Sequence, residues 1–219
     1  MRLYPSMMCV PPDKTKLLCG IFAEEGMAGL HIDIMDGTFV PNFTLGTDYC
    51  RYLHEISPLP LDIHLMIDRP EDKLSFFPIK EGDMVSVHAE STPHLMRAVN
   101  RIRERGAKPY AAINPATPIA DVFEVLPYVE GVLIMTVNPG FAGQRLIGSM
   151  SDKVKRMRRL MDDYGFQSKP IEVDGNISPE NLKLLKEAGA GAFVIGSSGF
   201  DSGSETDEIR RSLRVLSEI

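Results

Sequence analysis

Residues 29–43 read GLHIDIMDGTFVPNF, and the first half of this stretch sets a pattern that the rest of the chain repeats. Residues 29–35 form an apolar run of strand length, yet His31 and Asp33 place ionisable groups at alternate positions. Because alternate side chains of a strand lie on one face, His31 and Asp33 face together and the isoleucines between them face the other way. A charged pair inside a buried strand needs a chemical reason.

Eight short apolar runs, separated by segments with helical periodicity, predict a sheet covered by helices. We expect strands at residues 3–8, 29–35, 61–66, 84–89, 109–114, 132–137, 170–175 and 192–197. We expect helices near residues 13–25, 47–56, 70–80, 93–105, 118–128, 148–164, 178–188 and 205–218. Continuous apolar strands that alternate with helices are typical of a parallel sheet.

Eight such units in 219 residues predict an α/β fold of the (β/α)8 or TIM barrel type, with residues 1–219 as a single domain. An open, doubly wound sheet is the alternative fold. That fold normally carries a glycine-rich phosphate loop after its first strand. Here residues 7–12 read MMCVPP and contain no glycine, so we favour the closed barrel.

The composition limits the partners and the location of the protein. A net charge of −6 argues against nucleic acid and anionic membranes, which need a basic surface. We interpret the basic residues of KVKRMRRL, residues 153–160, as the solvent-exposed face of a helix. No apolar run approaches the ~18 residues of a membrane helix. Three cysteines without C-x-x-C spacing and no signal-peptide pattern predict a cytoplasmic location.

Polar side chains gather where the predicted strands end, and in a barrel of parallel strands these ends meet at one rim. His31, Asp33, His64 and Asp174 come from three strands and would converge there. Two imidazoles and two carboxylates without a thiolate suit one divalent ion, Zn²⁺, Mn²⁺, Fe²⁺ or Co²⁺. For any single one of these residues, the alternative is a buried histidine hydrogen-bonded to an aspartate.

Three methionines, Met35, Met66 and Met135, lie at or just past predicted strand ends. They suit either flexible core packing or a polarizable, water-poor cap over a metal and a reactive intermediate. His88 also ends a strand, and the sequence leaves open whether it contacts substrate or packs. None of the eight predicted strand ends carries a lysine, which weighs against Schiff-base chemistry and a lysine proton donor.

Small-residue turns follow three adjacent predicted strands. In VNPGFAGQ, residues 137–144, Gly140 and Gly143 allow backbone amides to face an anion. Gly175 follows the next strand and Gly196–Ser197 the last, where barrels of this type commonly hold a phosphate. We predict a phosphate site built from these turns, and tight connecting loops are the alternative.

Six ordered motifs over about residues 3–200 resemble those of the ribulose-phosphate 3-epimerase family. They are PSMM, HIDIMDGTFVPN, DIHLM, MTVNPGFAGQ, IEVDG and VIGSS. The resemblance implies an isomerase: a metal-dependent ketose-phosphate 3-epimerase on a (β/α)8 barrel, with a small-molecule sugar phosphate as substrate. We expect a homo-oligomer that binds neither nucleic acid nor a membrane.

The resemblance also assigns roles to residues of this sequence. His31, Asp33, His64 and Asp174 match the family's metal ligands, with Zn²⁺ as the favoured ion, and Asp33 and Asp174 match its acid/base pair. Matches to its substrate and phosphate contacts are Ser6, His64, Gly140, Phe141, Ala142, Gly143, Gly175, Asn176, Gly196 and Ser197.

Some motifs depart from the pentose members of the family, which usually read NPGFGGQ, DGG and GSA. This chain has Ala142, Asn176 and Ser198–Gly199 at those places. PSMMC, GFAGQ and GSSG look more like the branch that acts on D-allulose 6-phosphate, so that sugar and D-ribulose 5-phosphate both stay open as substrates. A non-catalytic sugar-phosphate sensor is the alternative function, although such a sensor could lose either aspartate and both are present.

The reaction accounts for the charged pair in the first motif. Epimerising the carbon next to a ketone removes a proton from one face and returns one to the other, so two bases are needed. We expect Asp33 and Asp174 to share this work in either direction, with a cation stabilising the enediolate.

Overall fold

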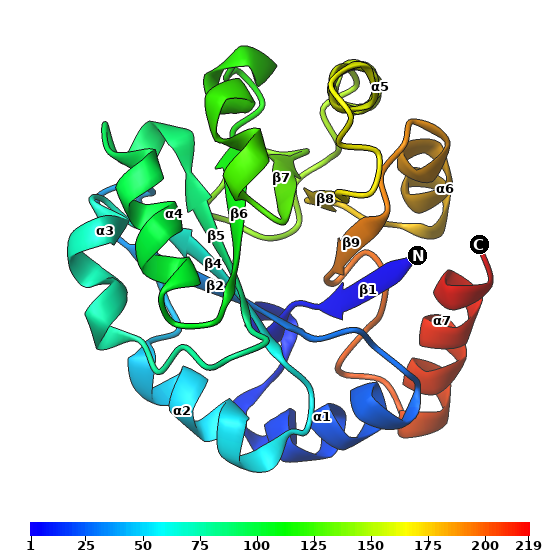
Figure 1. Cartoon of the computed structure of the whole chain (residues 1–219). Coiled ribbons are helices and arrows are strands. Elements are labelled where there is room, and N and C mark those ends of the chain that lie inside the picture. Colours follow the sequence, from blue (N-terminus) through cyan, green and yellow to red (C-terminus); the bar gives the residue numbers. More distant parts are fainter.

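The computed structural model describes all residues from 1 to 219 and forms one curled sheet surrounded by helices (Figure 1). Its strands are β1 (Arg2–Pro5), β2 (Leu30–Asp36), β3 (Phe43–Thr44), β4 (Leu61–Met66), β5 (Met84–His88), β6 (Lys108–Ile113), β7 (Gly131–Met135), β8 (Ile171–Asp174) and β9 (Ala192–Ile195). Figure 1 looks along the barrel, with the strands at the centre and the helices outside them.

The order of the strands makes the sheet a closed barrel. The neighbours run β1-β9-β8-β7-β6-β5-β4-β2, and each pair along this series is parallel. A parallel bridge between Ser6 and His31 then joins the end of β1 to β2 and closes the ring. The predicted (β/α)8 fold is therefore confirmed, and the open sheet is excluded.

Seven α-helices and five 3₁₀ helices lie in the connections between strands and after the last strand. The α-helices are α1 (Thr15–Glu24), α2 (Thr47–Ile56), α3 (Pro70–Lys73), α4 (Leu95–Arg103), α5 (Met150–Asp163), α6 (Pro179–Glu187) and α7 (Thr206–Glu218). The 3₁₀ helices are η1 (Met7–Cys9), η2 (Pro12–Lys14), η3 (Leu74–Phe76), η4 (Ala89–Ser91) and η5 (Ile119–Tyr128). None of these helices has the length and apolar character needed to cross a membrane.

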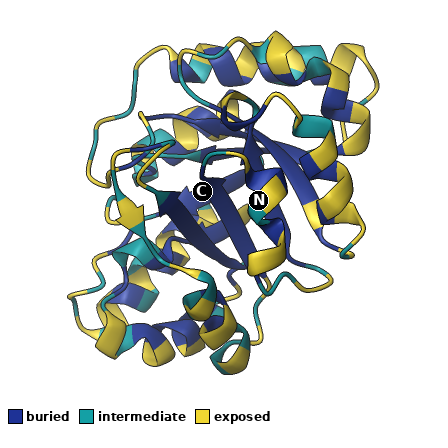
Figure 2. Ribbon diagram, turned by 90° about the vertical axis from the view of Figure 1, so that its left-hand side faces the viewer, coloured by how far each residue is buried: buried dark blue, intermediate teal, exposed yellow.

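The main hydrophobic core lies between the sheet and the helices, where Figure 2 shows buried strands and helices whose outer sides are exposed. Ile32 and Ile34 of β2 belong to this core. His31 and Asp33 alternate with them and project into the barrel, where both are buried. The alternation in the first motif thus separates the packing face of β2 from its chemical face.

Four elements differ from the sequence prediction. The first strand ends at Pro5, and residues 7–9 form η1 instead of continuing the strand. The helix predicted at 70–80 is only α3 followed by η3. The segment at 118–128 is the 3₁₀ helix η5, and Pro127 near its end has no amide to donate to an α-helix. The two-residue strand β3 was not predicted at all.

The interpretation of residues 153–160 as a solvent-exposed basic face is wrong at Lys153. This side chain is buried, and its Nζ donates hydrogen bonds to the carbonyl oxygens of Asn114, Pro115 and Thr117 at 2.6, 3.2 and 2.6 Å. Helical periodicity counts lysine as a surface residue, but a long aliphatic stem can be buried while its ammonium finds backbone acceptors. Lys153 therefore holds the turn that follows β6.

Candidate metal centre and substrate cavity

Four side chains from three strands converge inside the barrel. His31 and Asp33 come from β2, His64 from β4 and Asp174 from β8, and one ligand atom of each lies within 4.8 Å of the others. The register of the sheet produces this convergence, because Asp33 of β2 is paired with His64 of β4.

The spacing of these atoms suits a shared ion. His31 Nε2 lies 3.3 Å from Asp33 Oδ1 and 3.9 Å from Asp174 Oδ2. His64 Nδ1 lies 3.4 Å and 3.6 Å from the same two oxygens. Ligands about 2.0–2.1 Å from one tetrahedral ion are about 3.3–3.4 Å apart. His64 Nδ1 is also buried without a hydrogen-bond partner, so the donor set fits a divalent metal.

Two buried carboxylates behind this cluster were not predicted. Asp62 Oδ2 lies 2.5 Å from His31 Nδ1, a hydrogen bond too short to enclose an ion. It holds the proton on Nδ1 and leaves Nε2 free for a metal. Burial and the charge of Asp62 raise the pKa of Glu172 well above its usual value. Asp62 and Glu172 each stand two residues before a predicted ligand, a period-two signal that would have found them.

The two cluster aspartates have pKa values shifted in opposite directions. Burial and the negative charge of Asp33 raise the pKa of Asp174 to about 7. Burial also acts to raise the pKa of Asp33, but His31 and His64 outweigh it and hold that pKa below the usual value. Carboxyl groups with separated pKa values suit an acid/base pair. Burial lowers the pKa of His64 to about 4 and so favours its neutral, ligating form.

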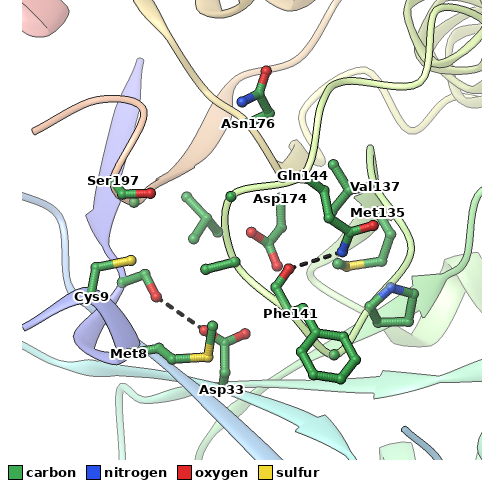
Figure 3. A pocket seen from close by; sticks show the side chains of 18 of the residues that line it. Met8, Cys9, Asp33, Met135, Val137, Phe141, Gln144, Asp174, Asn176 and Ser197 are labelled. Carbon is green, nitrogen blue, oxygen red and sulfur yellow. Dashed lines mark hydrogen bonds between the residues drawn. The ribbon is translucent and has the colours of Figure 1, made fainter. Parts of the chain in front are cut away.

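A cavity that is open to solvent lies at the carboxyl ends of the strands. In Figure 3 the carboxylates of Asp33 and Asp174 point toward one another across it. Ser6 Oγ donates a 3.0 Å hydrogen bond to Asp33 Oδ2 and thereby orients that carboxylate. The cavity thus has an acidic floor with one carboxylate on each of two sides.

Most of the predicted site residues line this cavity. They are Ser6, Asp33, Met35, Met66, Met135, Gly140, Phe141, Ala142, Gly143, Asp174, Gly175, Asn176, Gly196 and Ser197. His31, His64 and His88 are fully buried and do not line it. His64 therefore lies behind the cavity wall, where only its Nδ1 faces the carboxylates.

The three methionines are buried and line the cavity at the same time. Met35 and Met66 pack with Val40, while Met135 packs with Val137 and its neighbours. They serve as core packing and also form an apolar wall beside the carboxylates. Met8, from the 3₁₀ helix η1, adds a fourth thioether to the lining and was missed because residue 8 was assigned to the first strand.

The far end of the cavity is formed by the turns after β7, β8 and β9. The backbone amides of Gly143, Gly175, Gly196 and Ser198 have no hydrogen-bond partner in the chain, and no lysine or arginine lines the cavity. Free amides from several turns suit an anion bound without a charged side chain. The phosphate site stays a prediction, now located at these three turns.

Two residues after β8 show why the backbone there is constrained. Gly175 has φ +121°, and a Cβ on it would lie 2.6 Å from Val137 Cγ2, so only glycine fits. Asn176 has φ +55°, a left-handed conformation that asparagine tolerates. Its Nδ2 donates to Ser198 Oγ at 2.9 Å and ties this turn to the turn after β9.

The loop after β7 is held over the cavity by side-chain bonds to its backbone. Asn42 Nδ2 donates to the carbonyl oxygen of Gly140 at 2.8 Å. Gln144 Nε2 donates to the carbonyl oxygens of Asn138 and Phe141 at 2.6 and 2.9 Å. The Phe141 ring stays about half exposed at the mouth. Within the predicted turns, Val137, Asn138, Pro139, Gln144 and Ser198 also line the cavity. Cys9, Ile177 and Val194 line it as well and were not predicted.

Comparisons with known proteins identify the family of this chain. The profile of the ribulose-phosphate 3 epimerase family matches residues 2–200. The ribulose-phosphate 3-epimerase of Bacillus subtilis is 42% identical over 193 residues, which cover 86% of this chain and 89% of the relative. The chloroplastic ribulose-5-phosphate-3-epimerase of Arabidopsis thaliana is 45% identical over 84% of this chain and 66% of the relative.

The solved structures show the same fold at much lower identity. The tryptophan synthase α-subunit of Pyrococcus furiosus superimposes with a TM-score of 0.69 at 14% identity. The match covers 100% of this chain and 98% of that chain. At this identity the likeness concerns the fold alone.

Proposed function

We propose a mechanism and a substrate range for this chain from one premise: the chain belongs to the ribulose-phosphate 3-epimerase family. Its reaction is therefore the 3-epimerisation of a ketose phosphate, and the enzyme is an isomerase. The observation that carries the mechanism is the convergence of His31, Asp33, His64 and Asp174 beneath the cavity.

The first part of the proposal is a metal held by these four side chains. A nitrogen and oxygen donor set suits Zn²⁺ best, with Mn²⁺, Fe²⁺ and Co²⁺ as alternatives. When bound, a divalent cation stabilises the negative charge that develops as the proton leaves C3. The orphaned Nδ1 of His64 and the hydrogen bond between Asp62 and His31 support this assignment.

The second part is the division of labour between the two aspartates. One carboxylate removes the C3 proton from one face, and the C–H electron pair forms the double bond of a cis-enediolate. The other carboxyl group, protonated at the start, returns its proton to C3 from the opposite face. Two observations support this assignment. Asp33 and Asp174 face each other across the cavity, and their pKa values are shifted in opposite directions.

The third part concerns the substrate. We infer that the turns after β7, β8 and β9 bind the phosphate, and that both D-ribulose 5-phosphate and D-allulose 6-phosphate are turned over. Three of the motif departures, Ala142, Asn176 and Ser198, line this end of the cavity, and none lies among the metal ligands. Gly199, the fourth departure, is not part of the lining. A cytoplasmic location and a homo-oligomeric assembly stay predictions from the sequence.

One experiment tests the metal and the chemistry together. The purified protein is stripped with a strong chelator, dialysed, and given each ketose phosphate in D₂O with and without Zn²⁺, Mn²⁺, Fe²⁺ or Co²⁺. We expect the stripped enzyme to be inactive, and at least one of these ions to restore epimer formation with deuterium at C3. Full activity in a verified metal-free preparation would contradict the metal role. A protein that binds sugar phosphate without exchanging the C3 hydrogen would be the sensor.

A further inference from the structure

His64 uses its two ring nitrogens in different directions. Its Nδ1 faces the carboxylates of Asp33 and Asp174, whereas its Nε2 lies 2.8 Å from Nε2 of His88. The two rings are stacked with centroids 5.0 Å apart, and both side chains are fully buried. Phe39 packs on the other side of His88 with ring centroids 4.8 Å apart.

The chain of contacts continues from His88 to a carboxylate at the rim. His88 Nδ1 lies 3.2 Å from Glu90 Oε2. Glu90 Oε1 accepts hydrogen bonds from the backbone amide of Asn114, at 2.7 Å, and from the hydroxyl of Thr117. Both oxygens of Glu90 are therefore occupied as acceptors, and the turn after β6 fixes the position of this carboxylate.

We propose that His88 and Glu90 are positioning residues that set the tautomer of His64, so that its Nδ1 lone pair faces the metal site. The inference rests on the proposed metal role of His64. The contacts run from His64 through His88 to Glu90, and the direction of each hydrogen bond follows from the acceptor at its far end.

A carboxylate can only accept, so His88 Nδ1 carries the proton that bonds to Glu90. An imidazole that carries a single proton, on Nδ1, has a lone pair on Nε2. The contact of 2.8 Å between the two Nε2 atoms holds one proton, which must belong to His64. His64 with its proton on Nε2 is unprotonated at Nδ1, which is the form that binds a cation.

The two histidine ligands are thus oriented by different means. His31 Nδ1 donates a hydrogen bond directly to the carboxylate of Asp62, inside the barrel. His64 reaches its carboxylate, Glu90, only through a second imidazole, and Glu90 is hydrogen-bonded to the turn after β6, which Lys153 also holds. The position of the turn after β6 is therefore coupled to the metal ligand on β4.

Glu90→Gln should reverse the direction of the hydrogen bonds between residue 90, His88 and His64, while the side chain keeps its size and shape. The amide of Asn114 and the hydroxyl of Thr117 still require an acceptor, so the glutamine oxygen turns toward them and its NH₂ faces His88. His88 must then accept at Nδ1 and carry its proton on Nε2, which drives the proton of His64 to Nδ1. We expect Zn²⁺ affinity, measured by competition with a chromogenic chelator, to fall about 10–100-fold.

A matched control lies elsewhere in the barrel. Asp83 is buried, faces His54 Nε2 at 3.0 Å and accepts from the backbone amides of Leu61 and Lys80. Asp83→Asn makes the same carboxylate-to-amide change beside a histidine that is not a ligand. We expect it to lower thermal stability while Zn²⁺ affinity and the d–d absorption spectrum of the Co²⁺-loaded protein stay as in the wild type. Glu90→Gln should alter that spectrum.

The wild-type protein gives a test that needs no variant. Long-range ¹H–¹⁵N spectra of the Zn²⁺-loaded protein report which imidazole nitrogens carry protons. We expect His88 to be protonated at Nδ1 and unprotonated at Nε2. Protonation of His88 at Nε2, or a Glu90→Gln affinity within twofold of the wild type, would overturn the inference alone. A wild-type protein that binds no divalent metal at this site would overturn the proposed function as well.

Discussion

The two ends of the cavity are built from different parts of the chain. At the end proposed to bind the metal, here the metal end, buried side chains of β2, β4 and β8 meet at distances set by strand register, and each imidazole has a further partner behind it. At the end proposed to bind the phosphate, here the phosphate end, three turns line the cavity with backbone amides that have no partner in the chain, and no lysine or arginine lies there. We infer from this difference that residues on the strands perform the reaction. The turns would then determine which length of sugar phosphate fits.

The largest expected effect is at the metal end. Asp174→Asn removes one of the two bases, so epimerisation should fall by about a thousandfold or more. Asp33 can still remove a proton from one face, and washout of a C3 label from one epimer should persist if metal stays bound. The measurement is kcat with both epimers, together with label exchange and the metal content of the variant.

Metal loss is the alternative cause of such a decrease, so the variant is compared at equal and verified metal content. Interconversion of the epimers at close to the wild-type rate would contradict the two-base assignment. That result would also contradict the division between a metal end that performs the reaction and a phosphate end that selects the sugar, because the reaction would not depend on the carboxylate of Asp174.

The metal end could be predicted from the sequence because strand periodicity is rigid. An H-x-D pattern inside an apolar run places both groups on one face, and parallel strands bring their ends to one rim. The same period-two rule covers Asp62 and Glu172, which precede ligands by two residues. Asp62 and Glu172 were missed because only the ionisable groups nearest the carboxyl end of each predicted strand were assigned to the site.

The phosphate end was predicted less completely because its positions depend on turns rather than on a period. The glycines were found, but Cys9, whose Sγ lies near Gly196, was missed, since β1 ends at Pro5 and the chain then turns into the cavity wall. Lys153 shows the same limit on the outside of the barrel, because burial of a lysine depends on carbonyl groups some 40 residues away. Periodicity within one helix carries no information about them.

A smaller effect is expected from a methyl group at the phosphate end. Gly196 lines the cavity, and a Cβ on it would meet only Cys9 Sγ, at 3.2 Å. Gly196→Ala should therefore fold, narrow the phosphate turn and raise KM about tenfold, or about 1.4 kcal/mol, with kcat nearly unchanged. Steady-state kinetics on the metal-loaded variant make the measurement.

Gly191→Ala is the matched control, because Gly191 precedes β9 and a Cβ there meets nothing within 4 Å. It should leave both KM and kcat at their wild-type values. If Gly196→Ala instead lowered kcat or Zn²⁺ affinity while leaving KM intact, the two ends would not be separable in the way described above.

The smallest expected effect is the preference between the two sugars. A hexulose phosphate has one more carbon between C3 and the phosphate than a pentulose phosphate, so with C3 fixed at the aspartates the phosphate must lie farther away or the sugar chain must fold. Ala142, Asn176 and Ser198 line the end that would accommodate the difference, while the metal end is common to both reactions. We therefore predict activity on both sugars, with a modest preference for D-allulose 6-phosphate in side-by-side kcat/KM values. A preference of about a hundredfold for D-ribulose 5-phosphate, or about 2.7 kcal/mol at the transition state, would show that these turns are built for the pentose.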